Sequence, residues 1–202
     1  MTEHATKSRW PQLPLPHVPL PEPAAVPGAT VLYVDCPWKF GDALPGPGRG
    51  AKKHYQCMTV DALCEYKLPR LADDCLLAFW RCASMQNEAL RVIDAWGFVV
   101  KSELVWLKMT RNGKRHFGMG RYVRASHEVC LLATRGRVHV ADRSIRSVFE
   151  APVQEHSRKP DIVYELLERL VPAGPYVELF ARRHRYGWTS YGNELSIAQV
   201  CV

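Results

Sequence analysis

Short apolar runs alternate with amphipathic stretches along most of this chain. The runs predict strands because they are short, rich in branched and aromatic residues, and bounded by turn formers; they cover residues 31–35, 75–80, 98–107, 129–134, 144–149, 176–180 and 186–191. Thr59 and Ser84 are predicted to cap helices that end near 66 and 96, and Pro160 opens a clearer helix. This alternation predicts an α/β fold whose mostly parallel sheet is flanked by helices.

The length of 202 residues favours one domain with an extension. Residues 1–29 form a proline-rich arm, a composition that favours an extended segment docked on a surface, or equally a disordered leader. Residues 30–202 are predicted to form a single domain with a sizeable core. No apolar run approaches the roughly 20 residues of a membrane span, and no secretory signal is recognisable, so we expect no membrane partner.

The cysteine pattern argues against disulfides and against zinc. There are seven cysteines, an odd number, and none of them forms a C-x-x-C pair. Several lie in apolar runs, where a free cysteine behaves as a small hydrophobic residue. We therefore expect a reduced, cytoplasmic location. His127-Glu128 has no third ligand at a suitable spacing, so no metal is expected.

Positive charge is concentrated in one stretch of the chain. The net charge is +7, and no acidic residue occurs between Leu104 and His127. Clustered positive charge favours a polyanion, although a solvated basic face without a partner is the alternative. Glycines and the aromatic residues Phe117 and Tyr122 are interleaved with the charges, which favours a nucleic-acid-contacting loop. The expected contacts are Lys52, Lys53, Lys108, Arg111, Lys114, Arg115 and Arg121.

The tetrapeptide Asp35-Cys36-Pro37-Trp38 follows the first predicted strand. Open α/β sheets bind ligands just beyond the carboxyl ends of their strands. There a carboxylate and a backbone carbonyl can accept the two N–H hydrogens of an exocyclic amine and direct its lone pair toward an electrophile. Proline would fix the turn and tryptophan would offer a face to a base. The residues alone fit equally well a polar turn above a packed tryptophan.

Further elements follow this tetrapeptide in a fixed order: His54-Tyr55, Phe79-Trp80, Val105-Trp-Leu-Lys108, His127-Glu128, Lys159-Pro-Asp161, Glu178-Leu-Phe-Ala-Arg182 and Gly192-Asn-Glu194. In this order the chain resembles, over about residues 30–195, the MT-A70 family of S-adenosylmethionine-dependent adenine-N6 methyltransferases. The resemblance implies a Rossmann-like class I methyltransferase fold. It also implies a permuted motif order, in which the base pocket precedes the donor pocket.

The resemblance also implies roles for individual residues. The base pocket would comprise Asp35, Cys36, Pro37, Trp38 and Tyr55, with Cys36 standing where the family usually has proline and contributing its carbonyl. The donor pocket for S-adenosylmethionine would comprise Asp35, Lys159, Phe180, Arg182, Asn193 and Glu194. Glu128 would belong to a network that orders the basic loop.

The function that the resemblance implies is methyl transfer from S-adenosylmethionine to adenine N6 in DNA. DNA is preferred because the chain is minimal, carries no recognisable RNA-binding module and resembles a stand-alone enzyme of a prokaryote or of a phage-infected cell. The alternatives are the same reaction on RNA, a non-catalytic nucleic-acid-binding subunit of a methyltransferase complex, and an unrelated small-molecule N-methyltransferase. A homodimer and a heterodimer both remain open.

Overall fold

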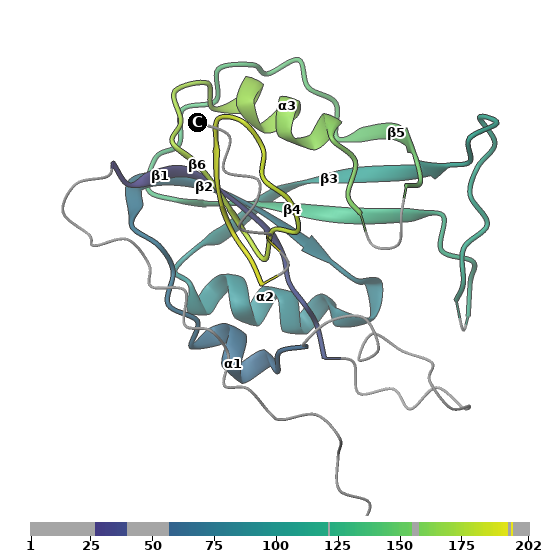
Figure 1. Ribbon diagram of the computed structural model, residues 1–202, viewed down its shortest axis with the longest axis horizontal. Coiled ribbons are helices and arrows are strands. Elements are labelled where there is room, and N and C mark those ends of the chain that lie inside the picture. The colour runs from purple at the N-terminus through teal and green to yellow at the C-terminus, as the bar shows by residue number, and fades with distance from the viewer. Residues whose placement is uncertain (1–26, 40–56, 121, 155–157, 194, 196–202) are drawn as a thin grey trace, which may run out of the picture.

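The structure is a computed structural model that describes residues 27–39, 57–120, 122–154, 158–193 and 195. A seven-stranded sheet forms its centre, with α3 on one face and α1 and α2 on the other (Figure 1). The strands are β1 (Ala29–Asp35), β2 (Leu71–Arg81), β3 (Val99–Met109), β4 (His127–Arg135), β5 (Val148–Pro152), β6 (Tyr176–Leu179) and β7 (Trp188–Tyr191). The helices are α1 (Val60–Cys64), α2 (Gln86–Ala95), α3 (Ile162–Leu170) and the 3-10 turn η2 (Ala83–Met85).

The direction of β4 determines which residues meet at one edge of the sheet. The strand order is β5-β3-β4-β2-β1-β6-β7, and only β4 runs antiparallel to its two neighbours. The predicted mostly parallel α/β sheet is therefore confirmed. Because β4 is reversed, its first residues lie beside the last residues of the other strands. Glu128, near the start of β4, thus shares an edge with Asp35, the last residue of β1.

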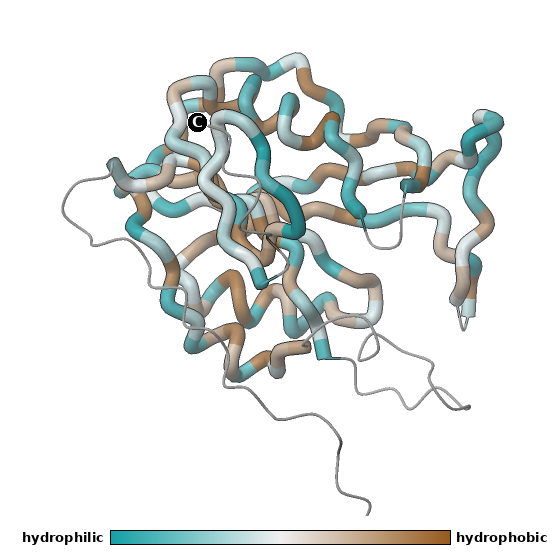
Figure 2. The backbone as a smooth tube through the Cα atoms, viewed as in Figure 1, coloured by the Kyte–Doolittle hydropathy of each residue, from teal (hydrophilic) through white to brown (hydrophobic). Residues whose placement is uncertain are grey.

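The core lies in two layers, one on each face of the sheet. Alternate residues of β1 point to opposite faces: Tyr33 packs in the layer beneath α3, and Val34 packs in the layer beneath α1 and α2. Figure 2 shows hydrophobic stretches along the central strands and mixed colouring on the helices. The buried residues of α2 and of α3 belong to these two layers, so both helices turn an apolar face to the sheet.

Local signals at the helix ends are confirmed in part. Thr59 caps α1, its Oγ1 accepting a hydrogen bond from the Ala62 N–H at 3.2 Å, and Gly97 follows α2 with φ +78°. Ser84 was the predicted cap of α2, and this prediction is wrong. Ser84 lies inside η2, and α2 begins at Gln86 after Met85, whose side chain makes no cap hydrogen bond.

Strand boundaries also differ from the sequence prediction. The run at 75–80 extends to Leu71–Arg81 because backbone pairing continues past the apolar residues, with β1 at Leu71 and with β4 at Arg81. The short strand predicted at 144–149 is shifted to Val148–Pro152. The Asp142 carboxylate accepts hydrogen bonds from the Ser144 N–H and hydroxyl, and this local turn removes residue 144 from the strand.

Candidate active site

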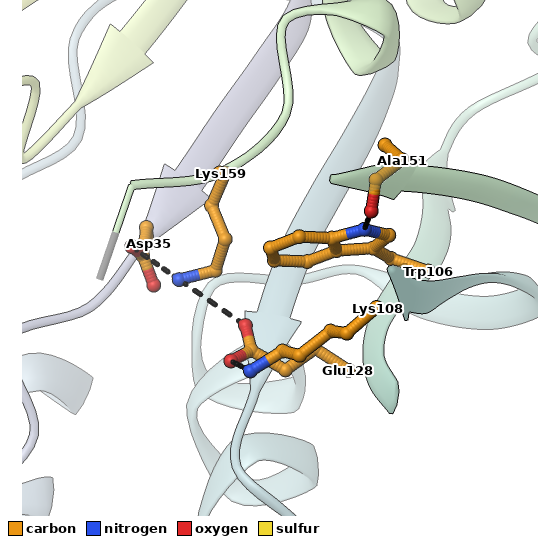
Figure 3. A network of polar contacts seen from close by, with 6 residues as sticks. All are labelled: Asp35, Trp106, Lys108, Glu128, Ala151 and Lys159. Carbon is orange, nitrogen blue, oxygen red and sulfur yellow. Dashed lines mark hydrogen bonds and ion pairs between the residues drawn. The ribbon is translucent and has the colours of Figure 1, made fainter. Parts of the chain in front are cut away.

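Four charged side chains from four separate segments meet at the carboxyl edge of the sheet (Figure 3). Asp35 ends β1, Lys108 lies near the end of β3, Glu128 lies near the start of β4, and Lys159 lies between β5 and α3. Asp35 and Lys159 are 124 positions apart in the chain. The sheet topology, rather than sequence proximity, assembles this group.

The four side chains form a line of alternating charge. Lys159 Nζ lies 2.7 Å from Asp35 Oδ2 and 3.5 Å from Glu128 Oε2. Lys108 Nζ lies 2.5 Å from Glu128 Oε1. Charge-assisted hydrogen bonds of this kind are short and strong, so the position of each carboxylate is fixed by a cation.

Two indole rings support the lysines. Lys159 Nζ lies 5.4 Å from the centre of the Trp80 ring, and Lys108 Nζ lies 5.2 Å from that of Trp106. The rings are held in turn by hydrogen bonds: Trp80 Nε1–H donates to Tyr33 Oη at 2.7 Å, and Trp106 Nε1–H donates to the Ala151 carbonyl at 2.8 Å. The lysine side chains are therefore restrained on their apolar side as well as by the acids.

The charge states of the network follow from burial and pairing. Burial alone would lower the pKa of Lys159, but Asp35 and Glu128 outweigh it and raise that pKa above its usual value. Burial alone would raise the pKa of Glu128, but Lys159 and Lys108 outweigh it and lower that pKa. Lys159 therefore remains a cation and Glu128 an anion at neutral pH, which makes Lys159 unsuitable as a proton acceptor.

The turn after β1 holds the Cys36 carbonyl in a defined direction. Its oxygen accepts a hydrogen bond from the Trp38 N–H at 2.9 Å, across Pro37. The neighbouring Pro37 carbonyl accepts from the Met58 N–H at 2.7 Å, which fastens the turn to the segment before α1. A carbonyl oxygen has two lone pairs, so Cys36 can accept one further hydrogen bond. Its predicted role as a backbone acceptor needs only that one.

The Cys36 side chain points into the core. It is 5% exposed and belongs to the cluster between the sheet and α2. Burial, with a contribution from Asp35, raises the pKa of its thiol well above the usual value. A thiolate nucleophile is therefore strongly disfavoured there. The described cysteines form no disulfide with one another.

Trp38 is more enclosed than its predicted stacking role requires. It is 3% exposed, and its ring meets Phe79 edge-on with the ring centres 5.9 Å apart. Its indole Nε1 is buried and has no hydrogen-bond partner among the described residues. Stacking on a base would require this ring or its neighbours to move, so that role stays a prediction.

Three of the residues predicted to bind the methyl donor, Phe180, Arg182 and Asn193, lie just beyond the adjoining ends of β6 and β7. Phe180 follows β6 with φ +59°, a strained backbone for a residue other than glycine, and its ring lies 5.2 Å from that of Tyr66. The Ala181 N–H donates to the Tyr191 carbonyl, which brings the chain around Arg182 close to Asn193. A Cβ at Gly192 would overlap the Ala181 carbonyl, so this close approach depends on glycine.

One buried carboxyl was assigned no role from the sequence. Glu178 of β6 is 8% exposed, and its Oε2 accepts a hydrogen bond from the Tyr164 hydroxyl at 2.9 Å. Burial raises its pKa to about 7, with Asp35 adding to the rise and Tyr164 and Arg185 opposing it. The sequence signals for this residue were its place at the start of the ordered motif that ends at Arg182 and its charge inside a short apolar run.

The predicted nucleic-acid residues divide into three groups. Arg111, Lys114 and Arg115 are exposed on the β3–β4 loop, residues 110–126. Lys108 instead belongs to the charge network, where its side chain is 18% exposed and paired with Glu128. The third group, Lys52, Lys53 and Arg121, lies outside the described residues. Tyr55 of the predicted base pocket and Glu194 of the predicted donor pocket also lie outside them.

The described part of the chain shows neither a metal site nor a membrane span. Within it, no group of three or more His, Cys, Asp or Glu residues could hold a metal ion. None of its helices has the length and apolar character that crossing a membrane requires.

An acidic residue at the end of the first strand of a mostly parallel α/β sheet, with helices on both faces, is consistent with a Rossmann-like methyltransferase fold. The chain belongs to the MT-A70 family, whose model matches residues 30–194.

Relatives of the chain occur in eukaryotes and bacteria. An N(6)-adenosine-methyltransferase MT-A70-like protein of Arabidopsis thaliana is 31% identical over 170 residues, which are 82% of this chain and 24% of that protein. The N(6)-adenosine-methyltransferase catalytic subunit METTL3 of Homo sapiens is 28% identical, again over 82% of this chain and 28% of that protein. Type II methyltransferase M.MunI of Mycoplasma sp is 27% identical over 82% of this chain and 77% of that protein. The chain thus spans about a quarter of the length of its eukaryotic relatives.

Proposed function

We propose that this protein transfers a methyl group from S-adenosylmethionine to N6 of adenine in DNA. The observation that carries the proposal is the position of Asp35, a carboxylate held by Lys159 and followed directly by the fixed Cys36 carbonyl. The family and the names of the relatives support the reaction type.

The two acceptors match the two hydrogens of an exocyclic amine. Such an amine is a poor nucleophile because its lone pair is delocalised into the ring. The Asp35 carboxylate retains lone pairs beyond the one that Lys159 engages, and the Cys36 carbonyl retains one. Accepting both N–H hydrogens orients the amine and localises its lone pair, and alignment of this kind supplies most of the rate enhancement such a transfer needs.

The charge network suits a cationic methyl donor. S-adenosylmethionine would supply an activated methyl group on a positively charged sulfur. Lys159 alone would repel that charge, but Asp35 and Glu128 balance Lys159 and Lys108. Lys159 can thus hold Asp35 in place without leaving the edge of the sheet positively charged.

Donor binding would fall to the residues at the ends of β6, β7 and α3. These are Lys159, Phe180, Arg182, Asn193 and Glu194, together with Asp35. Two polar atoms of this region are buried and make no hydrogen bond within the described residues: Ser190 Oγ on β7 and Arg158 Nε before α3. Unpaired buried donors of this kind fit a polar ligand.

DNA is the proposed polymer because the match to M.MunI, named a type II methyltransferase, spans most of that protein. The second candidate is RNA, because the plant and human relatives are named adenosine methyltransferases. A carboxylate and a carbonyl that recognise only the amine would accept adenine in either polymer.

One experiment separates these candidates. The purified protein is incubated with S-adenosylmethionine and duplex DNA, single-stranded DNA or RNA, and N6-methyladenine is quantified by mass spectrometry after digestion. We expect product in DNA with wild-type protein and none with Asp35→Ala. Product in RNA alone would show that the substrate is RNA instead of DNA. No product in any polymer would contradict the proposed activity.

A further inference from the structure

The β3–β4 loop carries large apolar side chains that face solvent. Four residues near its tip are at least three-quarters exposed: Phe117 (75%), Met119 (87%), Tyr122 (92%) and Val123 (78%). Figure 1 shows that the loop projects beyond the body of the sheet, on the side where β3 ends and β4 begins. Exposed apolar side chains gathered on one projecting loop are typical of a binding surface.

The loop backbone has a defined path that keeps these side chains outside. The His116 N–H donates to the Lys108 carbonyl at 2.8 Å, and the Gly118 N–H donates to the Ala125 carbonyl at 3.1 Å. A Cβ on Gly118 would overlap the Ala125 carbonyl, and one on Gly120 would overlap that of Val123. The two glycines therefore let the chain fold back on itself, and the apolar side chains project from the folded segment.

The surroundings of these side chains are positively charged. Arg111, Lys114 and Arg115 are exposed at the base of the loop, and no acid occurs between Leu104 and His127. The guanidinium of Arg124 lies 5.2 Å from the centre of the Phe117 ring. Cations beside exposed aromatic rings match the two parts of a nucleotide, because the cations can contact the phosphate and the rings can stack on the base.

We propose that this loop binds an unpaired nucleic-acid strand, with Phe117 and Tyr122 stacking on its bases. In a duplex the base faces are covered by their neighbours, so exposed rings gain little there, whereas unpaired bases present both faces. The inference rests on the proposed function, because that function gives the loop its purpose. The loop would hold the strand near the Asp35 site with an unpaired adenine that can enter the site.

A second copy of the chain is the competing occupant of this surface. Two such loops brought together would place their exposed arginines and lysines near one another without acids from either loop to compensate. Like charges oppose that contact, whereas a polyanion relieves the repulsion. Charge complementarity therefore favours nucleic acid.

The test uses a probe that cannot be methylated at adenine, so that strand binding is measured separately from methyl transfer. Binding of fluorescein-labelled oligothymidylate, which contains no adenine, and of a mixed-sequence duplex of the same length is measured by fluorescence anisotropy without donor. We expect Phe117→Ala/Tyr122→Ala to weaken oligothymidylate binding by about tenfold or more, and duplex binding by less than about twofold. The salt dependence should stay unchanged, because no charge is removed.

Two further variants make the result specific. Phe117→Tyr/Tyr122→Phe keeps both rings and should bind as wild type does. Val99→Ala removes an exposed apolar side chain at the opposite end of β3 and should also leave binding unchanged. All these positions are exposed, so equal melting temperatures are expected across the set.

Three outcomes would overturn the proposal. The first is an unchanged affinity of the alanine variant for oligothymidylate, and the second is an equal loss of affinity for single strand and duplex. The third is a wild-type dimer, seen by sedimentation, that the alanine variant disrupts without losing affinity for oligothymidylate. Because the probe holds no adenine, none of these outcomes depends on whether methyl transfer occurs. A failure of the loop proposal is thereby distinguished from a failure of the proposed activity.

Discussion

Lys159 places its ammonium 2.7 Å from the Asp35 carboxylate, although Asp35 ends β1 and Lys159 lies on the connection from β5 to α3. That connection starts from β5, an edge strand of the sheet, and leads to α3. Helix α3 packs on the face of the sheet to which Tyr33 of the central strand β1 points. The carboxylate is therefore positioned by the return of the chain across the sheet.

Replacing Lys159 by methionine should reduce methyl transfer strongly. Without its cation, the Asp35 carboxylate loses its main restraint, and Glu128 keeps only Lys108. We expect a loss of about 100-fold in kcat, the size typical of removing one oriented electrostatic contact. The exposed Lys101→Met is the matched control. If both variants transfer methyl groups at the wild-type rate, the pairing has no part in the reaction.

Replacing Cys36 by alanine should leave activity within about threefold of wild type. The proposed role of Cys36 uses its backbone carbonyl, which alanine retains, and its thiol is buried with a raised pKa. A loss of roughly 1 kcal/mol in the free energy of unfolding is expected from the small cavity. Cys75→Ala, at another buried free cysteine, controls for stability. Abolished transfer in the Cys36 variant alone would instead assign chemistry to the thiol.

The free energy of unfolding should fall between about pH 4.5 and 7 through Glu178. Its pKa is raised from 4.5 to about 7 in the fold, so the folded state binds the proton more tightly than the unfolded chain. The stabilisation is complete below pH 4.5 and lost as pH rises through 7. At 1.36 kcal/mol per unit, the contribution is at most about 3 kcal/mol.

Chemical denaturation at several pH values tests this dependence. Glu178→Gln should flatten the fall because glutamine carries no titrating proton, and it can still accept the Tyr164 hydrogen bond. Glu165→Gln, at an exposed position of the same helix that carries Tyr164, should retain the wild-type profile. Identical profiles for all three proteins would show that another group controls the pH dependence.

Much of the fold could be predicted from the sequence because periodicity and turn residues act locally. The strand that ends at Asp35, the cap at Thr59 and the amphipathic helix after Pro160 each depend on neighbouring residues alone. The reversal of β4 could not be predicted in this way, because an apolar run reads the same in both directions. The approach of Glu128 to Asp35 and Lys159 depends on that reversal.

Only part of the candidate site could be predicted from the sequence. The order of the motifs indicates which residues share a role, but it does not indicate which side chains touch. The motifs named Asp35 and Lys159, but their contact is a property of the crossover between distant segments. The enclosure of Trp38 depends on Phe79 from the adjacent strand, and no pattern within the tetrapeptide indicates it. Lys108 looked like a loop cation because its partner Glu128 lies beyond the acid-free stretch.

The central claim is that Asp35 orients the amine that receives the methyl group. The most direct test is the single-turnover rate of methyl transfer to adenine by Asp35→Asn, beside the exposed control Asp94→Asn, with donor affinity measured by calorimetry. Asparagine nearly keeps the shape but removes the charge that Lys159 holds. We predict a rate reduced by about 1,000-fold with donor affinity largely retained. Transfer at the wild-type rate by Asp35→Asn would contradict the account.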